Sequence, residues 1–270
     1  MVSFPNAKIN LGLNILGKRA DGFHDLQTVF YPVMLRDALE FIPNESGQLV
    51  FSSSGLVVDG HPEDNLCFKA YQLLKKDYPQ LPGLKIHLHK HIPMGAGLGG
   101  GSADAAFMLK MINEHFELKM DAERLMQYAA MLGSDCPFFI LNKPCVAKGR
   151  GERLSPIELN LSGYSILLIN PGIHINTGWA FRSLSQHTDV VPVEELINLP
   201  IEKWQGSLSN DFEIPVFAEY PEIAAIKEKL IAAGAVYASM SGSGSSVFGI
   251  FKSKPVSDFN FPQHYFQIWL

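Results

Sequence analysis

The sequence predicts a mixed α+β fold, and three observations carry that prediction. Residues 7–15 alternate apolar and polar side chains with the period of a β-strand. A glycine-rich segment at 93–104 separates a strand-like run from a helical one. The strand-like and helical runs of the first half follow the order strands, helix, strand, glycine loop, helix, helix instead of a strict βαβ repeat. With 270 residues, 47% hydrophobic and 18% charged, the chain has the composition of a folded globular protein.

Composition excludes several classes of function. The net charge of −5 argues against a protein that coats nucleic acid, which needs a concentrated basic surface. The N-terminus lacks the basic and apolar regions of a signal peptide, and no apolar run approaches the length that spans a bilayer. Three cysteines without paired metal spacing indicate reduced thiols and a cytoplasmic location.

The first half of the chain predicts strands and helices in an irregular order. Asp64 or Asn65 is suited to cap a helix, and Gly133 to end another. Strands are expected over residues 7–15, 26–34, 48–58 and 84–92, and helices over 66–77, 103–115 and 121–132.

A boundary is expected near the end of the stretch 146–156, which contains Gly149, Arg150 and Gly151. It divides the chain into domains of residues 1–154 and 155–270. Beyond it, strands are expected over 164–169, 236–240, 247–251 and 265–270, and an amphipathic helix over 221–233 that Gly234 ends.

The glycine segment has the features of a phosphate-binding loop. Five glycines within seven positions allow the backbone to curl around an anion, and the following helix adds unpaired N–H groups and the positive end of its dipole. The segment is Pro93-Met94-Gly95-Ala96-Gly97-Leu98-Gly99-Gly100-Gly101-Ser102-Ala103-Asp104. A Walker A loop would have lysine where Gly101 stands, and a dinucleotide-binding loop would follow the first strand of a βαβ unit. The alternative is a tightly packed turn.

The polar face of the first strand is a second candidate site. Lys8 lies between Asn6 and Asn10, whereas a solvated strand face usually carries Lys, Glu and Thr. The alternative is a lysine whose stem lies along the surface.

Three motifs in order resemble the GHMP kinase family. They are Pro5-Asn6-Ala7-Lys8-Ile9-Asn10-Leu11, the central loop from Pro93 to Ala103, and the glycine motif from Ser239 to Phe248. Arg19 to His24, Leu132 to Phe139, Asn170-Pro171-Gly172 and Asn210 to Glu213 are similar to those members that phosphorylate a cytidine diphosphate-linked polyol. The match spans nearly the whole chain.

This resemblance implies a two-domain GHMP kinase fold. Its N-terminal nucleotide-binding domain is like ribosomal protein S5, and its C-terminal domain is ferredoxin-like. The implied activity is transfer of the γ-phosphoryl group of ATP, bound with Mg²⁺, to a hydroxyl of the polyol. Homoserine, mevalonate or another small alcohol remain alternative acceptors. A binding protein that had lost catalysis would lack Lys8 or Asp135, and both are present.

The resemblance also assigns roles to single residues. Asp135 is implied as the catalytic base and Lys8 as the residue that orients it, although Asp135 by itself also suits a turn or helix cap. Asn10 is implied to hold the polyol, and Asn65 and Leu66 to lie near the adenine. The implied nucleotide loop runs from Pro93 to Ala103.

Other candidate ligands of phosphate or metal are suggested by their positions in the sequence. Lys90, three residues before the glycine loop proper, is placed to reach phosphate oxygens. Ser102 can cap the helix, approach Mg²⁺, or both. His87, His89 and His91 alternate, which is a spacing that metal ligands on one strand face can have, but no carboxylate or cysteine completes such a site, so a solvated face is expected.

The cytidine group is expected to meet aromatic side chains. Phe23, where the family often has tyrosine, keeps a stacking face without the hydroxyl. His24 has two ring nitrogens that can read the edge of cytosine, although a lone loop histidine is more often a surface residue. Phe181, after Thr177, is a second stacking candidate, with core packing as its alternative.

Overall fold

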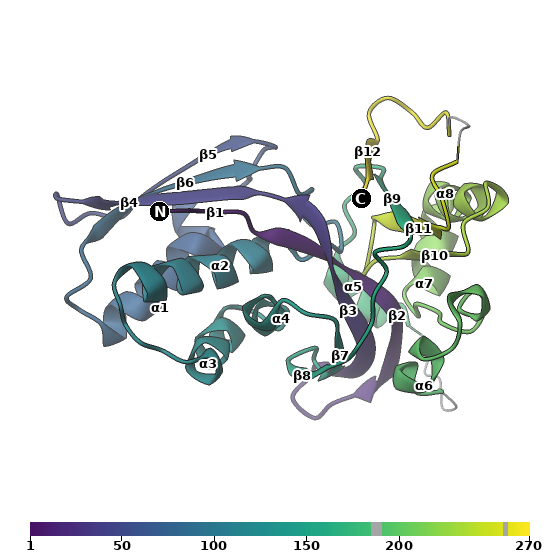
Figure 1. Cartoon of the computed structure of the whole chain (residues 1–270), viewed down its shortest axis with the longest axis horizontal. Coiled ribbons are helices and arrows are strands. Elements are labelled where there is room, and N and C mark those ends of the chain that lie inside the picture. Colours follow the sequence, from purple (N-terminus) through teal and green to yellow (C-terminus); the bar gives the residue numbers. More distant parts are fainter. Residues whose placement is uncertain (185–190, 256–258) are drawn as a thin grey trace. The chain divides into compact units, whose positions relative to one another are not determined.

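The computed structural model describes residues 1–184, 191–255 and 259–270. The chain divides into two compact units (Figure 1). Unit 1 contains Met1–Ala7, Pro32–Met94 and Gly99–Lys143, and unit 2 contains Lys8–Tyr31, Gly95–Leu98 and Pro144–Leu270. Each unit is therefore built from separate stretches of the sequence. The domain boundary at residues 154 and 155 stays a prediction.

Unit 1 is a four-stranded sheet with helices on one face (Figure 1). Its strands lie in the order β1 (Val2–Ser3), β4 (Ala38–Asn44), β6 (Gly83–Lys90), β5 (Val50–Gly55). Only the β5–β6 pair is parallel. The helical elements are η1 (Pro62–Asp64), α1 (Leu66–Asp77), α2 (Gly100–His115), α3 (Ala122–Leu132) and α4 (Cys136–Leu141).

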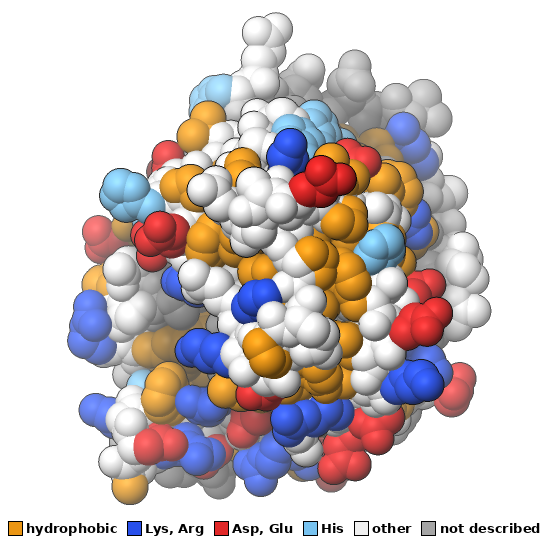
Figure 2. Space-filling model, turned by 90° about the vertical axis from the view of Figure 1, so that its left-hand side faces the viewer, with side chains coloured by type: hydrophobic (Ala, Val, Ile, Leu, Met, Phe, Trp, Pro, Cys, Tyr) orange, Lys and Arg blue, Asp and Glu red, His pale blue; other side chains and the backbone are white. Residues whose placement is uncertain are grey.

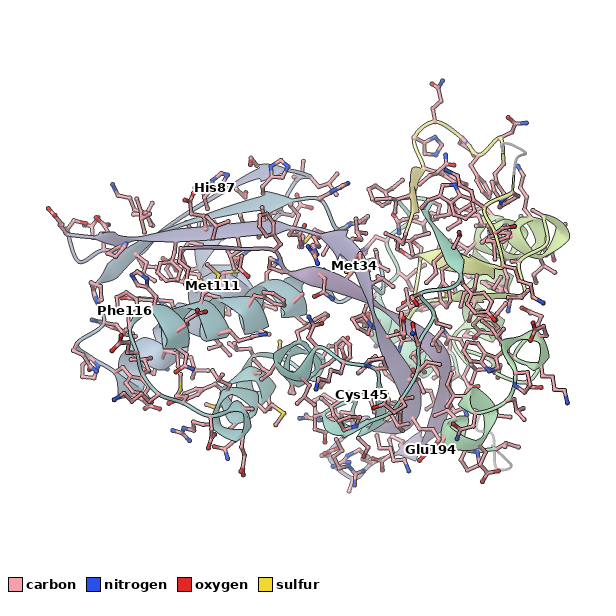
Figure 3. The ribbon with its side chains drawn as sticks, in the orientation of Figure 1. Met34, His87, Met111, Phe116, Cys145 and Glu194 are labelled. Carbon is pink, nitrogen blue, oxygen red and sulfur yellow. The ribbon has the colours of Figure 1, made fainter. Side chains whose placement is uncertain are left out.

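Strand β6 shows how side-chain alternation divides this sheet into two faces. Leu84, Ile86, Leu88 and Lys90 are buried, whereas the residues between them are not. In Figure 3, Met111 of α2 lies on the helix side of the sheet and His87 on the other side. Lys90 is therefore on the core face by its position in the strand.

The histidines of β6 belong to the outer face and are hydrogen-bonded to serines of β5. Ser54 Oγ lies 2.9 Å from His87 Nε2 and 3.0 Å from His89 Nδ1. His91 lies beyond the end of the strand. Within residues 1–184, 191–255 and 259–270, no group of three or more His, Cys, Asp or Glu is arranged to hold a metal ion.

Unit 2 contains most of one sheet and all of another. The first has the order β2 (Asn6–Lys18), β3 (His24–Arg36), β7 (Cys145–Gly149), β8 (Arg153–Pro156); β2 and β3 each have one end in unit 1. The second is antiparallel, with the order β10 (Tyr237–Met240), β11 (Val247–Phe251), β9 (Ser165–Asn170), β12 (Phe266–Trp269).

Helices of unit 2 share a core with the second sheet. Ile223, Ile226 and Leu230 of α8 (Pro221–Ala232) belong to the same buried cluster as Ile169 and Val247. The remaining helical elements are α5 (Thr177–Arg182), α6 (Val193–Ile197), η2 (Ile201–Lys203) and α7 (Glu213–Glu219). The spacing of apolar residues in α8 thus predicted both the helix and its packing face.

Most predicted elements are present, and the differences have physical reasons. Helix α2 begins at Gly100, three residues earlier than predicted, so part of the glycine segment is helical. Strand β4 was missed because Pro43 argues against a strand. The stretch interpreted as a boundary contains the β7–β8 hairpin, whose turn has Gly149 and Gly151 at φ 72° and 106°. Helices α4 to α7 are too short for helical periodicity to show.

The charged side chains on one end of the molecule are mixed in sign. Figure 2 shows Lys and Arg interspersed with Asp and Glu on that face. In the described part of the chain, no helix has the length and apolar character needed to cross a membrane.

We predict that Asp121→Ala destabilises the protein by about 1 kcal/mol. The Asp121 side chain accepts a hydrogen bond from Arg124 N at 2.8 Å and caps α3. Urea denaturation would measure the change in the free energy of unfolding. Asp59→Ala removes an exposed carboxylate outside any helix and is the control. Equal losses in both variants would show that the cap contributes nothing.

Candidate active site

The polar face of β2 is buried and hydrogen-bonded. Lys8 and Asn10 are 3% and 2% exposed. Lys8 Nζ donates to Asn10 Oδ1 at 2.6 Å and to the carbonyl of Gly97 at 3.2 Å, and it lies 4.9 Å from the ring centroid of Phe30. Asn10 Nδ2 donates to Thr28 Oγ1 at 3.0 Å. A lysine extended along the surface is therefore excluded, because burying an ammonium requires such partners.

The first half of the glycine loop, residues 95–98, belongs to unit 2 and is fixed by backbone contacts. Lys8 N donates to the carbonyl of Leu98 at 2.9 Å, and Ser241 Oγ donates to that of Gly97 at 2.8 Å. Gly97 has φ 77°, and a Cβ there would lie 1.9 Å from the Ser241 carbonyl oxygen. Only glycine fits this position.

The second half of the loop, in unit 1, starts α2. Gly99 is the N-cap residue in a left-handed conformation, with φ 70° and ψ 16°. Gly100 and Gly101 form the first turn, so neither residue has a side chain of its own beside its N–H group. A helix of 16 residues that starts this way presents its positive dipole end and donors together. This half of the loop retains the features of a phosphate-binding site.

Helix α1 begins beside that turn. Asn65 caps α1 by accepting a hydrogen bond from Cys67 N at 2.8 Å. A Cβ on Gly101 would lie 3.8 Å from Leu66 Cδ1, so Leu66 packs next to the start of α2. The predicted nucleotide-binding residues Asn65, Leu66 and Gly101 are therefore neighbours. Capping uses the Asn65 side-chain oxygen, a role the sequence already allowed.

Lys90 does not occupy the position expected of a phosphate ligand. Its side chain is 1% exposed and forms ion pairs with Asp37 and, at 2.9 Å, with Asp104. Asp37 Oδ1 also accepts hydrogen bonds from His91 N at 2.6 Å and Ile92 N at 2.8 Å. A Cβ on Gly100 would be 2.9 Å from Lys90 Nζ. We correct the expectation: Lys90 supports the first turn of α2 from the core side, because strand alternation points it inward.

Two carboxylates share this one buried ammonium. Burial, together with the charge of Asp37, raises the pKa of Asp104 to about 7, although Lys90 opposes the shift. Asp104 Oδ1 is buried without a hydrogen-bond partner among the described residues. Such an environment favours a carboxyl group that binds a proton near neutral pH.

Asp135 precedes α4 but does not cap it with its side chain. The helix-cap alternative is therefore not realised, and the half-buried carboxylate has other interactions. The next residue, Cys136, has a hydrogen bond with Ser102 in the first turn of α2. The segment that carries Asp135 thus lies against the start of α2. Its predicted pairing with Lys8 stays a prediction.

The aromatic candidates form two separate stacks in unit 2. Phe23 is 52% exposed, and the guanidinium of Arg150 lies 4.6 Å from its ring centroid. His24 stacks on Phe181 with centroids 4.8 Å apart and an interplanar angle of 16°. A base between those rings would need a separation of about 7 Å, twice the contact distance. Phe181 therefore supports His24 here, and the predicted stacking of the base on Phe23 and on Phe181 stays a prediction.

Thr177, predicted to bind the substrate, lies near the C-terminal glycine motif. Thr177 is the first residue of α5, and its Oγ1 lies 3.1 Å from Ser243 Oγ. Burial, and to a lesser degree the charge of Lys18, lowers the pKa of His24 and so favours its neutral ring. A neutral imidazole has one donor and one acceptor nitrogen, as reading a base edge requires.

Sequence reasoning missed two positions that contact candidate site residues. Arg150 was noted only as part of a glycine-rich boundary, yet it covers Phe23. Ser241 was noted only as part of a motif, yet its hydroxyl contacts Gly97 and Asn10. The inward position of Lys90 could have been predicted from the sequence, since residues 84, 86 and 88 are apolar and lie on the same strand face.

Comparison with known proteins defines the class. The family model for the N-terminal domain of GHMP kinases matches residues 65–143, and the model for their C-terminal domain matches residues 182–258. Together with the fold and the glycine loop, these matches show that the chain belongs to the GHMP kinase family. Members of this family are ATP-dependent kinases.

Two relatives and one solved structure that are similar to this chain carry the name of the same kinase. A protein of Bacteroides fragilis named 4-diphosphocytidyl-2-C-methyl-D-erythritol kinase is 54% identical over 93% of this chain and 92% of its own. One of the same name from Azobacteroides pseudotrichonymphae is 50% identical over 98% and 100%. A crystal structure of 4-(cytidine 5'-diphospho)-2C-methyl-D-erythritol kinase is 33% identical, with a TM-score of 0.79 over 93% of this chain and 90% of that one.

We predict that Asp104→Asn makes stability less dependent on pH. An acid whose pKa is raised from 3.8 to about 7 on folding stabilises the fold below pH 3.8 and loses that contribution as pH rises to about 7. The variant lacks this titration, so its free energy of unfolding should fall less than that of wild type between pH 5 and 8.

Urea denaturation at pH 5, 6.5 and 8 measures this difference. Asp59→Asn, which changes an exposed carboxylate, is the matched control and should keep the wild-type slope. A parallel loss of stability at every pH in Asp104→Asn would contradict the raised pKa.

Proposed function

We propose that this chain transfers the γ-phosphoryl group of ATP to the 2-hydroxyl of 4-diphosphocytidyl-2-C-methyl-D-erythritol, in the non-mevalonate route to isoprenoid precursors. The observation that carries the proposal is the high identity, over nearly the whole chain, with relatives that bear this name. The buried Lys8–Asn10 pair and the glycine loop supply residues suited to that chemistry.

In this proposal the glycine loop and the start of α2 hold the phosphates of ATP. The open first turn of α2 donates backbone N–H groups, and Asn65 and Leu66, beside it, lie against the adenine. Mg²⁺ usually binds phosphates plus one or two protein oxygens. Ser102, in that turn, offers such an oxygen, so we propose that it faces the metal.

Asp135 and Lys8 carry the phosphoryl transfer. The substrate hydroxyl attacks the γ-phosphorus, the bond to the β–γ bridging oxygen breaks, and ADP leaves. Asp135 takes the hydroxyl proton, while Lys8 orients the carboxylate and neutralises charge on the moving group. Asn10 and Thr177 position the polyol.

Recognition of the cytidine group begins at the exposed ring of Phe23. A base that stacks there meets Arg150 on one side, and His24 reads its edge while Phe181 holds the imidazole in place. A cytoplasmic location fits the buried thiols of Cys67, Cys136 and Cys145 and stays a prediction.

The direct test is product formation by purified protein with ATP, Mg²⁺ and the cytidine substrate. Homoserine and mevalonate in the same assay address the alternative acceptors. Phosphorylation of either at a comparable kcat/KM would contradict the proposed acceptor.

We predict that Asp135→Asn lowers kcat by about 10²-fold or more, since the variant keeps the shape and loses the proton acceptor. The affinity for ATP should change little. Steady-state kinetics and ATP titration measure the two effects. Asp121→Asn is the matched control, because it makes the same change at the start of α3 and asparagine also caps helices. A near-normal kcat in Asp135→Asn would make this residue structural.

We predict that Phe23→Ala lowers kcat/KM for the cytidine substrate by roughly 5- to 150-fold, the cost of losing one stacking face of about 1–3 kcal/mol. The affinity for ATP should stay the same. His24→Ala should have a similar effect and also weaken discrimination against a uridine analogue, whose edge has an acceptor where cytosine has a donor.

Kinetics with both nucleotide substrates compare these variants with wild type. His264→Ala, an exposed histidine on the segment before β12, is the control. If neither Phe23→Ala nor His24→Ala changes efficiency or base preference, the cytidine pocket lies elsewhere.

A further inference from the structure

A short segment of unit 2 joins β2 to the turn of the C-terminal glycine motif. Leu13 N donates to the carbonyl of Ser209 at 2.8 Å, and Asp211 N donates to that of Leu13 at 2.8 Å. Asp211 Oδ2 also accepts from Ile15 N at 2.7 Å. Residues 209–211 therefore extend along β2, the strand that carries Lys8 and Asn10.

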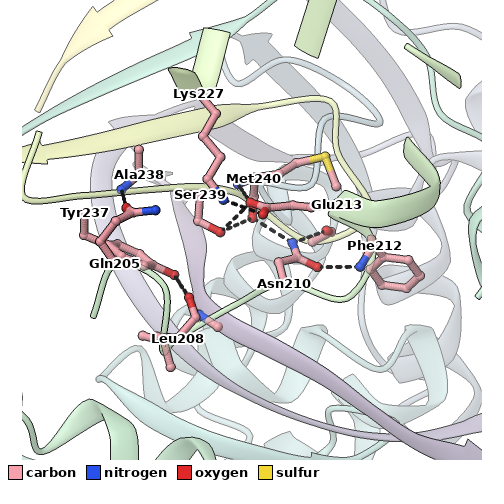
Figure 4. A network of polar contacts seen from close by, with 12 residues as sticks. Gln205, Leu208, Asn210, Phe212, Glu213, Lys227, Tyr237, Ala238, Ser239 and Met240 are labelled. Carbon is pink, nitrogen blue, oxygen red and sulfur yellow. Dashed lines mark hydrogen bonds and ion pairs between the residues drawn. The ribbon is translucent and has the colours of Figure 1, made fainter. Parts of the chain in front are cut away.

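Asn210 lies in the middle of this segment, and both the nitrogen and the oxygen of its side-chain amide form hydrogen bonds. It is 2% exposed. Its Nδ2 donates to the carbonyls of Met240 at 2.8 Å and Gly242 at 2.9 Å, and its Oδ1 accepts from Phe212 N at 3.0 Å (Figure 4). Asparagine supplies the two N–H donors and the acceptor that these contacts need. Aspartate has the same length, but its carboxylate has no donor.

The turn that Asn210 holds contacts the candidate active site. Ser241 lies between the two carbonyls that Asn210 binds. Its Oγ donates to the carbonyl of Gly97 at 2.8 Å and accepts from Asn10 N at 3.2 Å. Gly97 is also the acceptor of Lys8 Nζ. The contacts form a closed ring from β2 through Asn210 and Ser241 to the glycine loop and back to β2.

Glu213 fixes the other side of the same turn. Its Oε1 accepts from Ser239 Oγ at 3.0 Å and Met240 N at 2.8 Å, and its Oε2 pairs with Lys227 Nζ at 2.5 Å (Figure 4). Both oxygens are thus used at a residue 8% exposed. With Met240 held by its N–H and its carbonyl, the backbone entering Ser241 has little freedom.

We propose that Asn210 is a positioning residue for phosphoryl transfer, acting through Ser241 on Gly97, Lys8 and Asn10. This proposal rests on the proposed function, because that function supplies the phosphoryl transfer for which these residues would be positioned. Phosphoryl transfer depends on alignment, and a displacement of about 1 Å can reduce the rate about 10²-fold. The amide sets that alignment by fixing where the Ser241 hydroxyl lies.

The first variant is Asn210→Asp, which keeps the size and the acceptor and removes both donors. We expect a cooperatively folded protein whose kcat falls by about 10²-fold, with a smaller change in the KM for ATP. Amide hydrogen exchange should become faster at Lys8, Asn10, Ser241 and Ser246, whose N–H groups are bonded within the ring.

Asn113→Asp is the matched control. Asn113 Nδ2 donates to the carbonyl of Met120 at 3.1 Å and its Oδ1 accepts from Met120 N at 2.9 Å, so this amide also bonds a backbone donor and a backbone acceptor, at the far end of α2. This variant should lose stability without a change in kcat or in exchange at the four amides. Should Asn210→Asp fail to fold, Asn210→Ser, which retains one donor and adds no charge, takes its place.

A double-mutant cycle with Ser241→Ala separates positioning from general stability. If Asn210 acts through Ser241, the double variant should have nearly the kcat of the more impaired single variant. Additive losses in kcat, or a kcat within about threefold of wild type in Asn210→Asp, would overturn the proposal.

Failure of the proposed function gives a different result. If wild type does not phosphorylate the cytidine compound, the exchange comparison still decides, since it needs no acceptor. Faster exchange at the ring amides in Asn210→Asp but not Asn113→Asp supports the proposal, and unchanged exchange overturns it.

Discussion

The rest of the candidate active site depends on the hydrogen bonds that the carbonyl of Gly97 accepts. This carbonyl accepts hydrogen bonds from Lys8 Nζ and Ser241 Oγ, which are 89 and 144 positions away along the chain. A Cβ on Gly97 would collide with the Ser241 backbone, so this close approach is possible only for glycine. Glycine at this position therefore serves the packing of one loop on another as much as flexibility.

The polar atoms around that carbonyl are buried, and each has partners that offset its loss of hydration. Lys8 and Asn10 bond to each other, and Asn10 continues to Thr28. In the side chains of Asn210 and Glu213, every nitrogen and oxygen atom has a hydrogen-bond or ion-pair partner. A fully bonded buried network is rigid, because any displacement leaves a polar group without water or partner. That rigidity suits a reaction in which alignment supplies most of the rate.

Unit 1 uses buried charge differently. Lys90 lies between Asp37 and Asp104, with one carboxylate oxygen left without a partner in the described structure. An excess negative charge in a buried site is costly, and the raised pKa of Asp104 expresses that cost. The cluster supports the turn at which α2 begins. In the function proposed above, choice of the acceptor falls to other residues, such as Phe23 and Arg150, since one scaffold can serve many substrates.

The sequence by itself determined the local features of this protein. It identified the glycine loop followed by a helix, a helix cap at Asp64 or Asn65, and the alternation of β2, because each depends on residues within one or two turns of each other. It also contained the motifs of the family. Tertiary structure decided what depends on distant partners: the stack of His24 on Phe181, the inward position of Lys90 between two acids, and the link from Asn210 to Met240 and Gly242. No local pattern encodes those contacts, since their partners are brought together only when the strands and helices pack.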